Sequence, residues 1–132
     1  IDYVHKSAKE DFKKIAFKYW PGALTMVIPC SKKDNTVLTS RNSTLGLRIP
    51  NSFMAQSLMK VTGPLLTSSA NISGLNGSIT AEGVALDFPS VDILGPLPWE
   101  KGSGKASTII SWSESGEWEL IREGGVLVSE LQ

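Results

Sequence analysis

Apolar residues recur at helical spacing near the start of the chain. Between residues 8 and 19 they fall three or four positions apart, which places them on one face of a helix. Ser7 and Glu10 have the spacing of a capping box, in which each side chain satisfies an unpaired backbone N–H group at the helix start. Pro21-Gly22 would end the helix. The pattern therefore predicts an amphipathic helix over residues 8–19.

Short apolar runs separated by turn residues predict strands further along the chain. They cover residues 24–28, 44–49, 65–68, 91–94, 107–112 and 117–122. Each run is too short for a typical helix, and Gly, Pro, Ser or Lys lies within two residues of each of its ends. Lys32 to Asn35 reads as a turn, and Ser113 to Gly116 joins the last two strands as a hairpin.

Two more helices are predicted between these strands. Asn51 or Ser52 caps one that runs through residue 61, and Thr80 caps a shorter one that ends near Phe88-Pro89. Strands that alternate with helices and end in a hairpin predict an α/β fold with a twisted, open, mixed parallel/antiparallel sheet and flanking helices. A length of 132 residues without an obvious linker predicts a single domain over residues 1–132.

Composition excludes several classes of protein. With 41% hydrophobic and 20% charged residues, and no apolar run near the ~20 residues of a membrane span, the chain reads as an ordinary globular protein without a membrane segment. No signal-peptide pattern opens it, and one cysteine, Cys30, suits a reducing compartment, so a cytoplasmic location is expected. His5 is the only histidine, which leaves no material for a zinc site or a His-centred triad.

Charge is balanced overall but uneven along the chain. Residues 1–60 hold ten Lys/Arg and four Asp/Glu, whereas residues 61–132 hold three and nine. Such asymmetry can mark an anion-binding half. It can equally be a solvated helix face, and this second interpretation is favoured because five lysines fall between residues 6 and 18.

A stretch of small polar residues follows the apolar run Gly63 to Leu66. If the strand continues, Thr67, Ser69 and Asn71 point to one face, and Gly74 lets a backbone approach closely. This arrangement suits a phosphate-bearing ligand at the carboxyl end of a strand. The alternative is a turn whose side chains satisfy their own backbone, and on this stretch alone the turn is favoured.

Two arginines lie within or at the end of apolar runs. Arg48 interrupts the run 45–50 and Arg122 ends the run 117–122. Arginine is costly to bury without an anion, so each is expected to meet a carboxylate or a phosphate. For a single arginine an internal carboxylate is the commoner partner, but two beside a hydroxyl-rich strand end favour a bound anion. Their chemistry would be positioning and charge stabilisation, as in nucleotidyl transfer.

Five segments, in this order, resemble the YrdC-like threonylcarbamoyl-AMP synthases. They are Trp20 to Thr25, Leu47 to Asn51, Gly63 to Gly74, Ala106 to Ile110 and Leu120 to Gly124. The resemblance implies the twisted open sheet of that family around a large cavity. The family's N-terminal strand and its Lys-x-Arg element have no counterpart here, so the chain is expected to be roughly the C-terminal two-thirds of a YrdC-like domain, and activity of this piece alone stays open.

The resemblance implies a nucleotidyltransferase of tRNA modification. Such enzymes join ATP, L-threonine and bicarbonate into L-threonylcarbamoyladenylate and release pyrophosphate. A carbamate made from the threonine amine and bicarbonate would attack the α-phosphate, with Mg²⁺ helping pyrophosphate leave. A partner machinery then transfers the threonylcarbamoyl group to the adenosine at position 37 of tRNA.

The same resemblance implies roles for eight side chains. Those expected to bind ATP are Thr44, Ser69, Asn71, Ser78 and Arg122, and those expected to bind L-threonine are Arg48, Thr67 and Ser107. No protein nucleophile and no protein metal ligand is expected. Two alternatives remain: a carbamoyl-transfer domain of the hydrogenase-maturation type, and a non-catalytic RNA-binding module, which zero net charge makes the weaker of the two.

Overall fold

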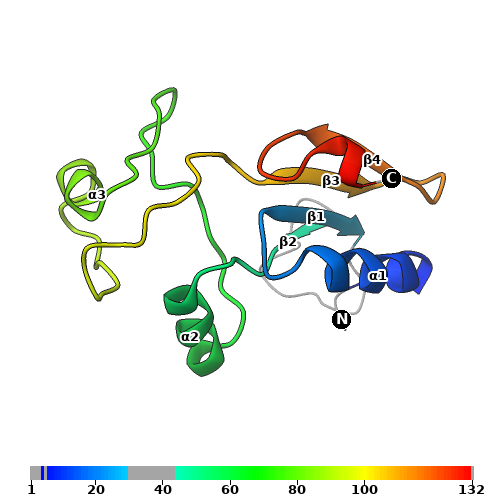
Figure 1. The fold of residues 1–132 in the computed structure, drawn as a ribbon, viewed down its shortest axis with the longest axis horizontal. Helices are drawn as coiled ribbons and strands as arrows, with labels where there is room; N and C mark the ends of the chain where they lie inside the picture. Colours follow the sequence, from blue (N-terminus) through cyan, green and yellow to red (C-terminus); the bar gives the residue numbers. More distant parts are fainter. Residues whose placement is uncertain (1–3, 5, 30–43, 132) are drawn as a thin grey trace. The chain divides into compact units, whose positions relative to one another are not determined.

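The computed structural model describes residue 4, residues 6–29 and residues 44–131 (Figure 1). The predicted turn at Lys32 to Asn35, together with His5 and Cys30, lies outside these residues. The chain forms two compact units, which are described separately below: the first comprises Ile1–Asn51 and Lys105–Gln132, and the second comprises Ser52–Gly104.

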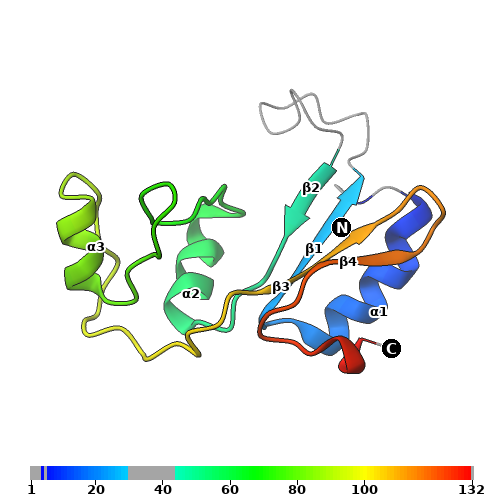
Figure 2. The same cartoon turned by 90° about the horizontal axis from the view of Figure 1, so that it is seen from above.

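A four-stranded mixed sheet organises the first unit. Its strands are β1 (Leu24–Pro29), β2 (Thr44–Leu47), β3 (Thr108–Trp112) and β4 (Trp118–Arg122). They lie in the order β2-β1-β3-β4, with β1 parallel to β3 and with β2 and β4 antiparallel to their neighbours (Figure 2). The predicted mixed parallel/antiparallel sheet is confirmed. The predicted hairpin between the last two strands is confirmed as well.

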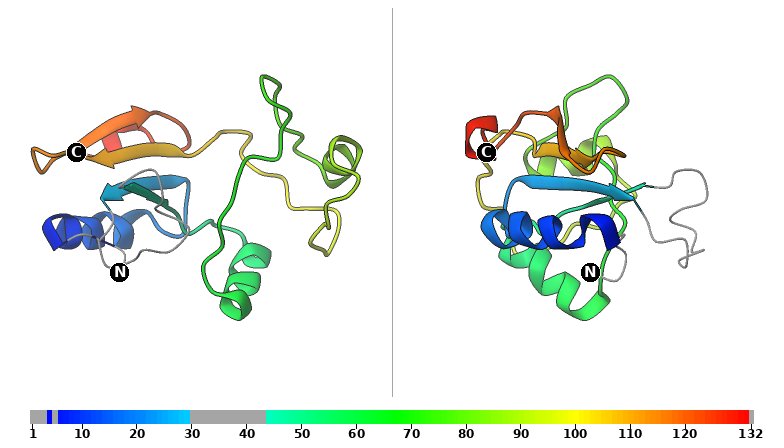
Figure 3. Two further views of the ribbon diagram at one scale, coloured as in Figure 1. Left: turned by 180° about the vertical axis from the view of Figure 1, so that it is seen from behind. Right: turned by 90° about the vertical axis from the view of Figure 1, so that its right-hand side faces the viewer.

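One helix packs against one face of this sheet. The helix α1 (Lys9–Tyr19) follows the 3₁₀ turn η1 (Lys6–Ala8) and lies along the sheet (Figures 1 and 3). Strand positions alternate, so every second residue of β1 and of β3 is buried toward the helix. The buried apolar side chains of this core are Val4, Ala8, Phe12, Leu24, Met26, Ile28, Ile110, Trp112 and Val126. The amphipathic pattern read from the sequence thus produces the core.

The start of α1 differs from the predicted capping box. The helix begins at Lys9 with Ala8 as its cap residue, and the alanine side chain cannot accept a capping hydrogen bond. Ala8 has αR backbone angles and is fully buried in the core. Ser7 lies inside η1, one position before the cap residue, so the predicted helix is confirmed but its cap residue is not the predicted one.

The segment after β4 returns to the start of β3 and is fastened by one buried hydroxyl. Thr108 Oγ1 donates to the carbonyl of Val126 at 2.6 Å and accepts from the N–H groups of Gly124 and Val126 at 2.9 and 3.0 Å. A Cβ on Gly124 would overlap the main chain of Ala106 and Ser107, so only glycine fits this crossing. The chain then ends in the 3₁₀ turn η3 (Val128–Glu130).

The second unit contains two capped helices. In α2 (Phe53–Thr62) the Ser52 side chain accepts from the N–H of Ala55, and in α3 (Ala81–Asp87) Thr80 accepts from the N–H of Gly83 at 3.1 Å. Both predicted helices and caps are confirmed. None of the helices in the described residues is long and apolar enough to cross a membrane.

Two predicted strands are absent from the second unit, and one predicted strand of the first unit is shorter than expected. Residues 65–68 and 91–94 have no strand conformation, and Leu66 is 71% exposed. A strand requires a hydrogen-bonded neighbour, and none of the described residues of this unit provides one. The predicted strand 44–49 ends at Leu47, because Arg48 and Ile49 turn to bond Gly22 instead.

Candidate functional site

The eight predicted binding residues divide between the two units. Thr44, Arg48, Ser107 and Arg122 belong to the first unit, and Thr67, Ser69, Asn71 and Ser78 to the second. Their geometry is therefore described within each unit.

Arg48 is fixed by one end of its guanidinium. Its Nε donates to the main-chain carbonyl of Gly22 at 2.9 Å, and the N–H of Gly22 donates to the carbonyl of Ile49 at 2.8 Å. Partial desolvation lowers the pKa of the Arg48 side chain, although the residue as a whole is exposed, and arginine keeps its charge at neutral pH. No carboxylate of the described residues pairs with Arg48, and its terminal nitrogens have no hydrogen-bond partner among those residues. A forked donor group is thus held by its Nε alone within the described part of the chain.

Arg122 is held by a main-chain carbonyl in a comparable way. Its Nη2 and Nε donate to the carbonyl of Ser107 at 2.9 and 3.3 Å. The Ser107 hydroxyl lies 2.9 Å from the hydroxyl of Thr25. No carboxylate within the described ranges forms an ion pair with Arg122. The two predicted arginines thus share one feature: each is positioned by a backbone carbonyl rather than by an acid.

Register places both arginines at the same end of the sheet. Arg122 pairs with Ile109, which pairs with Thr25, and Arg48 follows Leu47 and so lies level with Thr25. Three strand spacings separate them, about 14 Å between Cα atoms. This end holds the carboxyl ends of β2 and β4 and the amino ends of the parallel pair β1 and β3. Arg48, Ser107 and Arg122 therefore lie at the same end of the sheet.

Thr44 lies at the opposite end of the same strand. It pairs with Pro29, the last residue of β1, about 13 Å along β2 from Arg48. Thr44, Gly46 and Arg48 nevertheless share one exposed face of β2, away from α1. A Cβ on Gly46 would lie 3.7 Å from Thr25, an ordinary contact, so this glycine leaves space on the face rather than relieving a clash.

Thr67 and Ser69 are exposed on a loop of the second unit. Neither hydroxyl has a hydrogen-bond partner in the part of the chain that the structure describes. The amide of Asn71, in contrast, donates to the carbonyls of Ile72 and Leu75 at 3.2 and 3.1 Å and so closes its own loop. Gly74 has a φ of +84° in this loop, which explains the glycine by backbone conformation. Asn71 thus bonds its own loop, as the turn interpretation expects. The hydroxyls of Thr67 and Ser69 have no partner among the described residues.

Ser78 is engaged by an acidic neighbour. Its hydroxyl lies 2.9 Å from a carboxylate oxygen of Asp87, at the end of α3. A carboxylate repels phosphate, so Ser78 would have to leave Asp87 to bind a nucleotide phosphate directly.

Thr25 is a polar residue of this region to which the sequence assigned no role. It belongs to the segment Trp20 to Thr25, one of the five that carry the family resemblance. Strand alternation puts it on the face opposite the buried Leu24 and Met26. That alternation was the available signal, but its neighbour Ser107 lies 82 positions away and could not be identified from spacing.

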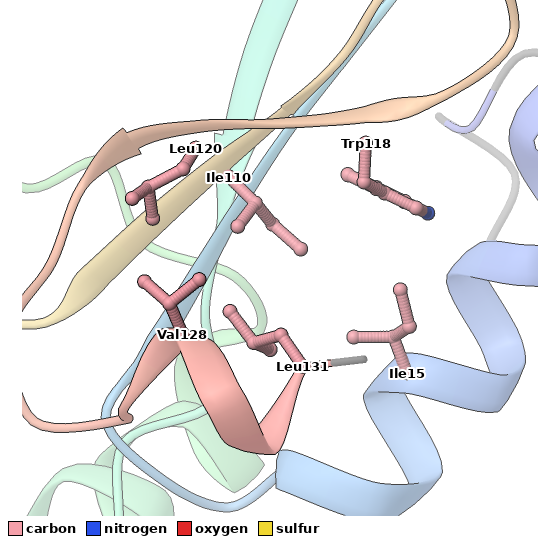
Figure 4. Close-up of a pocket in the computed structure, with 6 residues that line it drawn as sticks. All are labelled: Ile15, Ile110, Trp118, Leu120, Val128 and Leu131. Atoms are coloured by element: carbon pink, nitrogen blue, oxygen red, sulfur yellow. The ribbon is translucent and has the colours of Figure 1, made fainter.

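An apolar cavity of about 180 Å³ lies on the helix side of the sheet (Figure 4). It is lined by Ile15, Ile110, Trp118, Leu120, Val128 and Leu131. The indole Nε1 of Trp118 is buried there without a hydrogen-bond partner in the described residues. The lining carries no acid, base or charge, so this cavity belongs to the packing of α1 on the hairpin and not to the predicted site.

Comparison with known proteins identifies relatives over the whole chain. Residues 1–124 match the family model Sua5_yciO_yrdC, described as "Telomere recombination". A protein of Pyrococcus abyssi (strain GE5 / Orsay) named "Threonylcarbamoyl-AMP synthase" is 31% identical over 135 residues, which cover 100% of this chain and 39% of that protein. A protein of the same name from Bacillus subtilis (strain 168) is 33% identical over 130 residues, covering 95% of this chain and 36% of its own length.

A solved structure agrees with the same relationship. "Crystal structure of P. abyssi Sua5 complexed with L-threonine" superposes with a TM-score of 0.82 at 32% identity, covering 98% of this chain and 38% of that one. The chain spans about two fifths of the length of these three relatives.

Proposed function

The chain belongs to the Sua5/YciO/YrdC family, and on that premise we propose that it forms L-threonylcarbamoyladenylate from ATP, L-threonine and bicarbonate. One observation carries the proposal. Arg48 and Arg122 lie level with Thr25 at one end of the sheet, and neither has a carboxylate partner among the described residues. Two separated cationic groups suit a product with a carboxylate at one end and a phosphate at the other.

Arg48 would bind the carboxylate of L-threonine. Its Nε is committed to Gly22, which fixes the plane of the guanidinium and leaves both terminal nitrogens for the two carboxylate oxygens. Ser107 and Thr67 would complete the threonine pocket through their hydroxyls. The P. abyssi structure was determined with L-threonine, which supports the same substrate here.

Arg122 would bind the nucleotide together with Ser69, Asn71, Ser78 and Thr44. Arg122 donates two hydrogen bonds to the carbonyl of Ser107, which is proposed to bind L-threonine. The two substrates would therefore be oriented by residues that are held to each other. For Asn71 and Ser78 the proposal requires exchange of their present partners, Ile72, Leu75 and Asp87, for the ligand.

The proposed reaction needs no protein nucleophile. The threonine amine adds to bicarbonate with loss of water to give a carbamate, whose oxygen attacks the α-phosphate of ATP and displaces pyrophosphate. The arginines hold the reacting ends in line and offset the negative charge that accumulates between carbamate and phosphate.

Magnesium would enter this reaction with the nucleotide, because it favours phosphate oxygens as ligands. In the part of the chain that is described, no group of three or more His, Cys, Asp or Glu side chains lies close enough to hold a metal ion.

The proposed product has a defined use. Threonylcarbamoyl-AMP would pass to a tRNA-modifying machinery that transfers the threonylcarbamoyl group to adenosine. Direct RNA contact and a cytoplasmic location belong to the same proposal. Residues 1–132 would form a single YrdC-like domain.

Substrate-dependent pyrophosphate release tests the function. The chain is assayed alone and also grafted into the P. abyssi relative in place of the segment that it matches. We expect pyrophosphate release that requires ATP, L-threonine and bicarbonate together, with the product identified by mass spectrometry. Release with carbamoyl phosphate instead of threonine would support the carbamoyl-transfer alternative. RNA binding without turnover in either protein would support the RNA-binding alternative.

A further inference from the structure

Thr25 contacts the hydroxyl of Ser107 from the neighbouring strand. The two oxygens are 2.9 Å apart, one from the beginning of β1 and the other from the residue before β3. Thr25 lies on the sheet face opposite α1, as the alternation of buried residues in β1 requires, and the contact places the Ser107 hydroxyl beside it. The contact joins two strands that the sequence separates widely.

The backbone around Ser107 is already held from two directions. Its carbonyl accepts from Arg122, and the next residue, Thr108, donates its N–H to the carbonyl of Ala23 and binds Gly124 and Val126 through its hydroxyl. These backbone contacts leave the χ1 torsion of Ser107 free, because an unbranched side chain has three rotamers available. Within the described residues, Thr25 supplies the hydrogen bond that fixes it.

Threonine suits this role better than serine would. Its branched Cβ restricts χ1, so its hydroxyl has a defined direction before any ligand arrives. A hydroxyl carries one donor proton and two acceptor lone pairs. After the bond with Thr25, Ser107 therefore keeps capacity for at least one further hydrogen bond, in a direction set by Thr25. Only 9% of Ser107 is exposed, so that direction determines what the residue can reach.

We propose that Thr25 is a positioning residue for amino-acid recognition: it orients the Ser107 hydroxyl toward bound L-threonine through the 2.9 Å contact between their side chains. The inference rests on the proposed function and adds a residue to it. Thr25 acts through Ser107 and does not itself touch the substrate.

The test is a double-mutant cycle on L-threonine binding. Thr25→Val removes the hydroxyl and keeps the shape, Thr25→Ser keeps the hydroxyl, and Ser107→Ala removes the group that Thr25 orients. Ser111→Ala is the matched control, since Ser111 lies on the same face of β3 four residues further on. L-threonine and ATP dissociation constants are measured by calorimetry, and folding of each variant by thermal unfolding.

We expect Thr25→Val to weaken L-threonine binding about tenfold and ATP binding less than about twofold, as loss of one net hydrogen bond to a bound ligand implies. Thr25→Ser should restore most of the affinity. The double variant should bind no more weakly than Ser107→Ala alone, because Thr25 has no effect without Ser107.

Three results would overturn the inference. Unchanged L-threonine affinity in Thr25→Val, or losses that add in the double variant, would show that Thr25 does not act through Ser107. Equal weakening of threonine and ATP binding that Thr25→Ser fails to rescue would assign Thr25 to packing alone. If the unsubstituted chain and its graft bind no L-threonine, the proposed function itself fails, and this outcome is distinct from those three.

Discussion

The guanidinium of Arg122 and the main-chain carbonyl of Ser107 are joined by two hydrogen bonds, at 2.9 Å from Nη2 and 3.3 Å from Nε. The contact closes the end of the β3–β4 hairpin at which the chain enters β3. It satisfies part of the arginine fork but supplies no negative charge. A positive group is thus held rigidly at the edge of a sheet, which is the arrangement an anionic substrate requires.

Replacement of Arg122 should weaken nucleotide binding. Arg122→Lys keeps the charge but cannot contact the Ser107 carbonyl with one edge and a phosphate with the other. We expect ATP binding to weaken about tenfold to a hundredfold, which corresponds to the net value of a charged hydrogen bond. Titration calorimetry with ATP measures this. Arg122→Gln also removes the charge and should weaken ATP binding further, and Lys14→Gln on α1 is its control for loss of one positive charge. An unchanged ATP affinity in Arg122→Lys would refute the assignment.

Replacement of Arg48 should act on the amino acid instead. Arg48→Lys loses the fork that binds Gly22 and a carboxylate together, so the dissociation constant for L-threonine should rise at least about tenfold while that for ATP stays within about twofold. L-threonine methyl ester, which lacks the carboxylate charge, serves as the matched ligand. It should bind the variant and the original chain equally weakly. A fall in ATP affinity as large as the fall in threonine affinity would contradict separate roles for Arg48 and Arg122.

Substitutions of Gly46 should affect the free energy of unfolding and ligand binding differently. The backbone of Gly46 is not in the left-handed region, and a Cβ would meet the Thr25 and Val27 methyl groups at 3.7 and 3.9 Å. Gly46→Ala should therefore raise the free energy of unfolding by about 0.5–1 kcal/mol. Gly46→Val should project over the face that holds Thr44 and Arg48 and weaken ligand binding about tenfold or more. Urea unfolding and L-threonine titration measure the two effects, and a Gly46→Val variant that binds normally would show that this face is not part of the pocket.

Loss of the buried Thr108 hydroxyl should destabilise the first unit. Thr108→Val leaves two N–H groups and one carbonyl of the segment after β4 without their partner. We expect a loss of about 2–5 kcal/mol in the free energy of unfolding, as for several buried polar groups left unsatisfied. Equilibrium urea unfolding measures it. Thr108→Ser, which keeps the hydroxyl, should lose about 1 kcal/mol, and equal losses in the two variants would refute the hydrogen-bonding role.

Much of the fold was predictable because it depends on neighbouring residues. Helical spacing predicted α1, and the hydroxyl caps at Ser52 and Thr80 predicted the starts of α2 and α3. Alternation and turn residues predicted β1, β3 and β4, and the alternating order of elements predicted the mixed sheet. These signals act over a few residues, so a sequence displays them directly.

Predictions failed where a partner distant in the sequence decides the outcome. Residues 65–68 have strand composition, but the described part of the second unit offers no neighbouring strand, and the run stays unpaired. Ser7 was the predicted cap residue of α1, but the cap residue is Ala8, one position later, and it is buried in the core.

The sequence by itself determined which side chains can bind anions, and its five ordered segments determined the family. Only the tertiary structure decided that Arg48 and Arg122 lie level with Thr25, that Arg122 is fastened to Ser107, and that Thr44 lies at the other end of its strand. Residue type is a local property, whereas strand register is fixed by burial of alternate side chains across the whole sheet. For that reason candidate binding residues could be named from the sequence, but the geometry that relates those of the first unit could not.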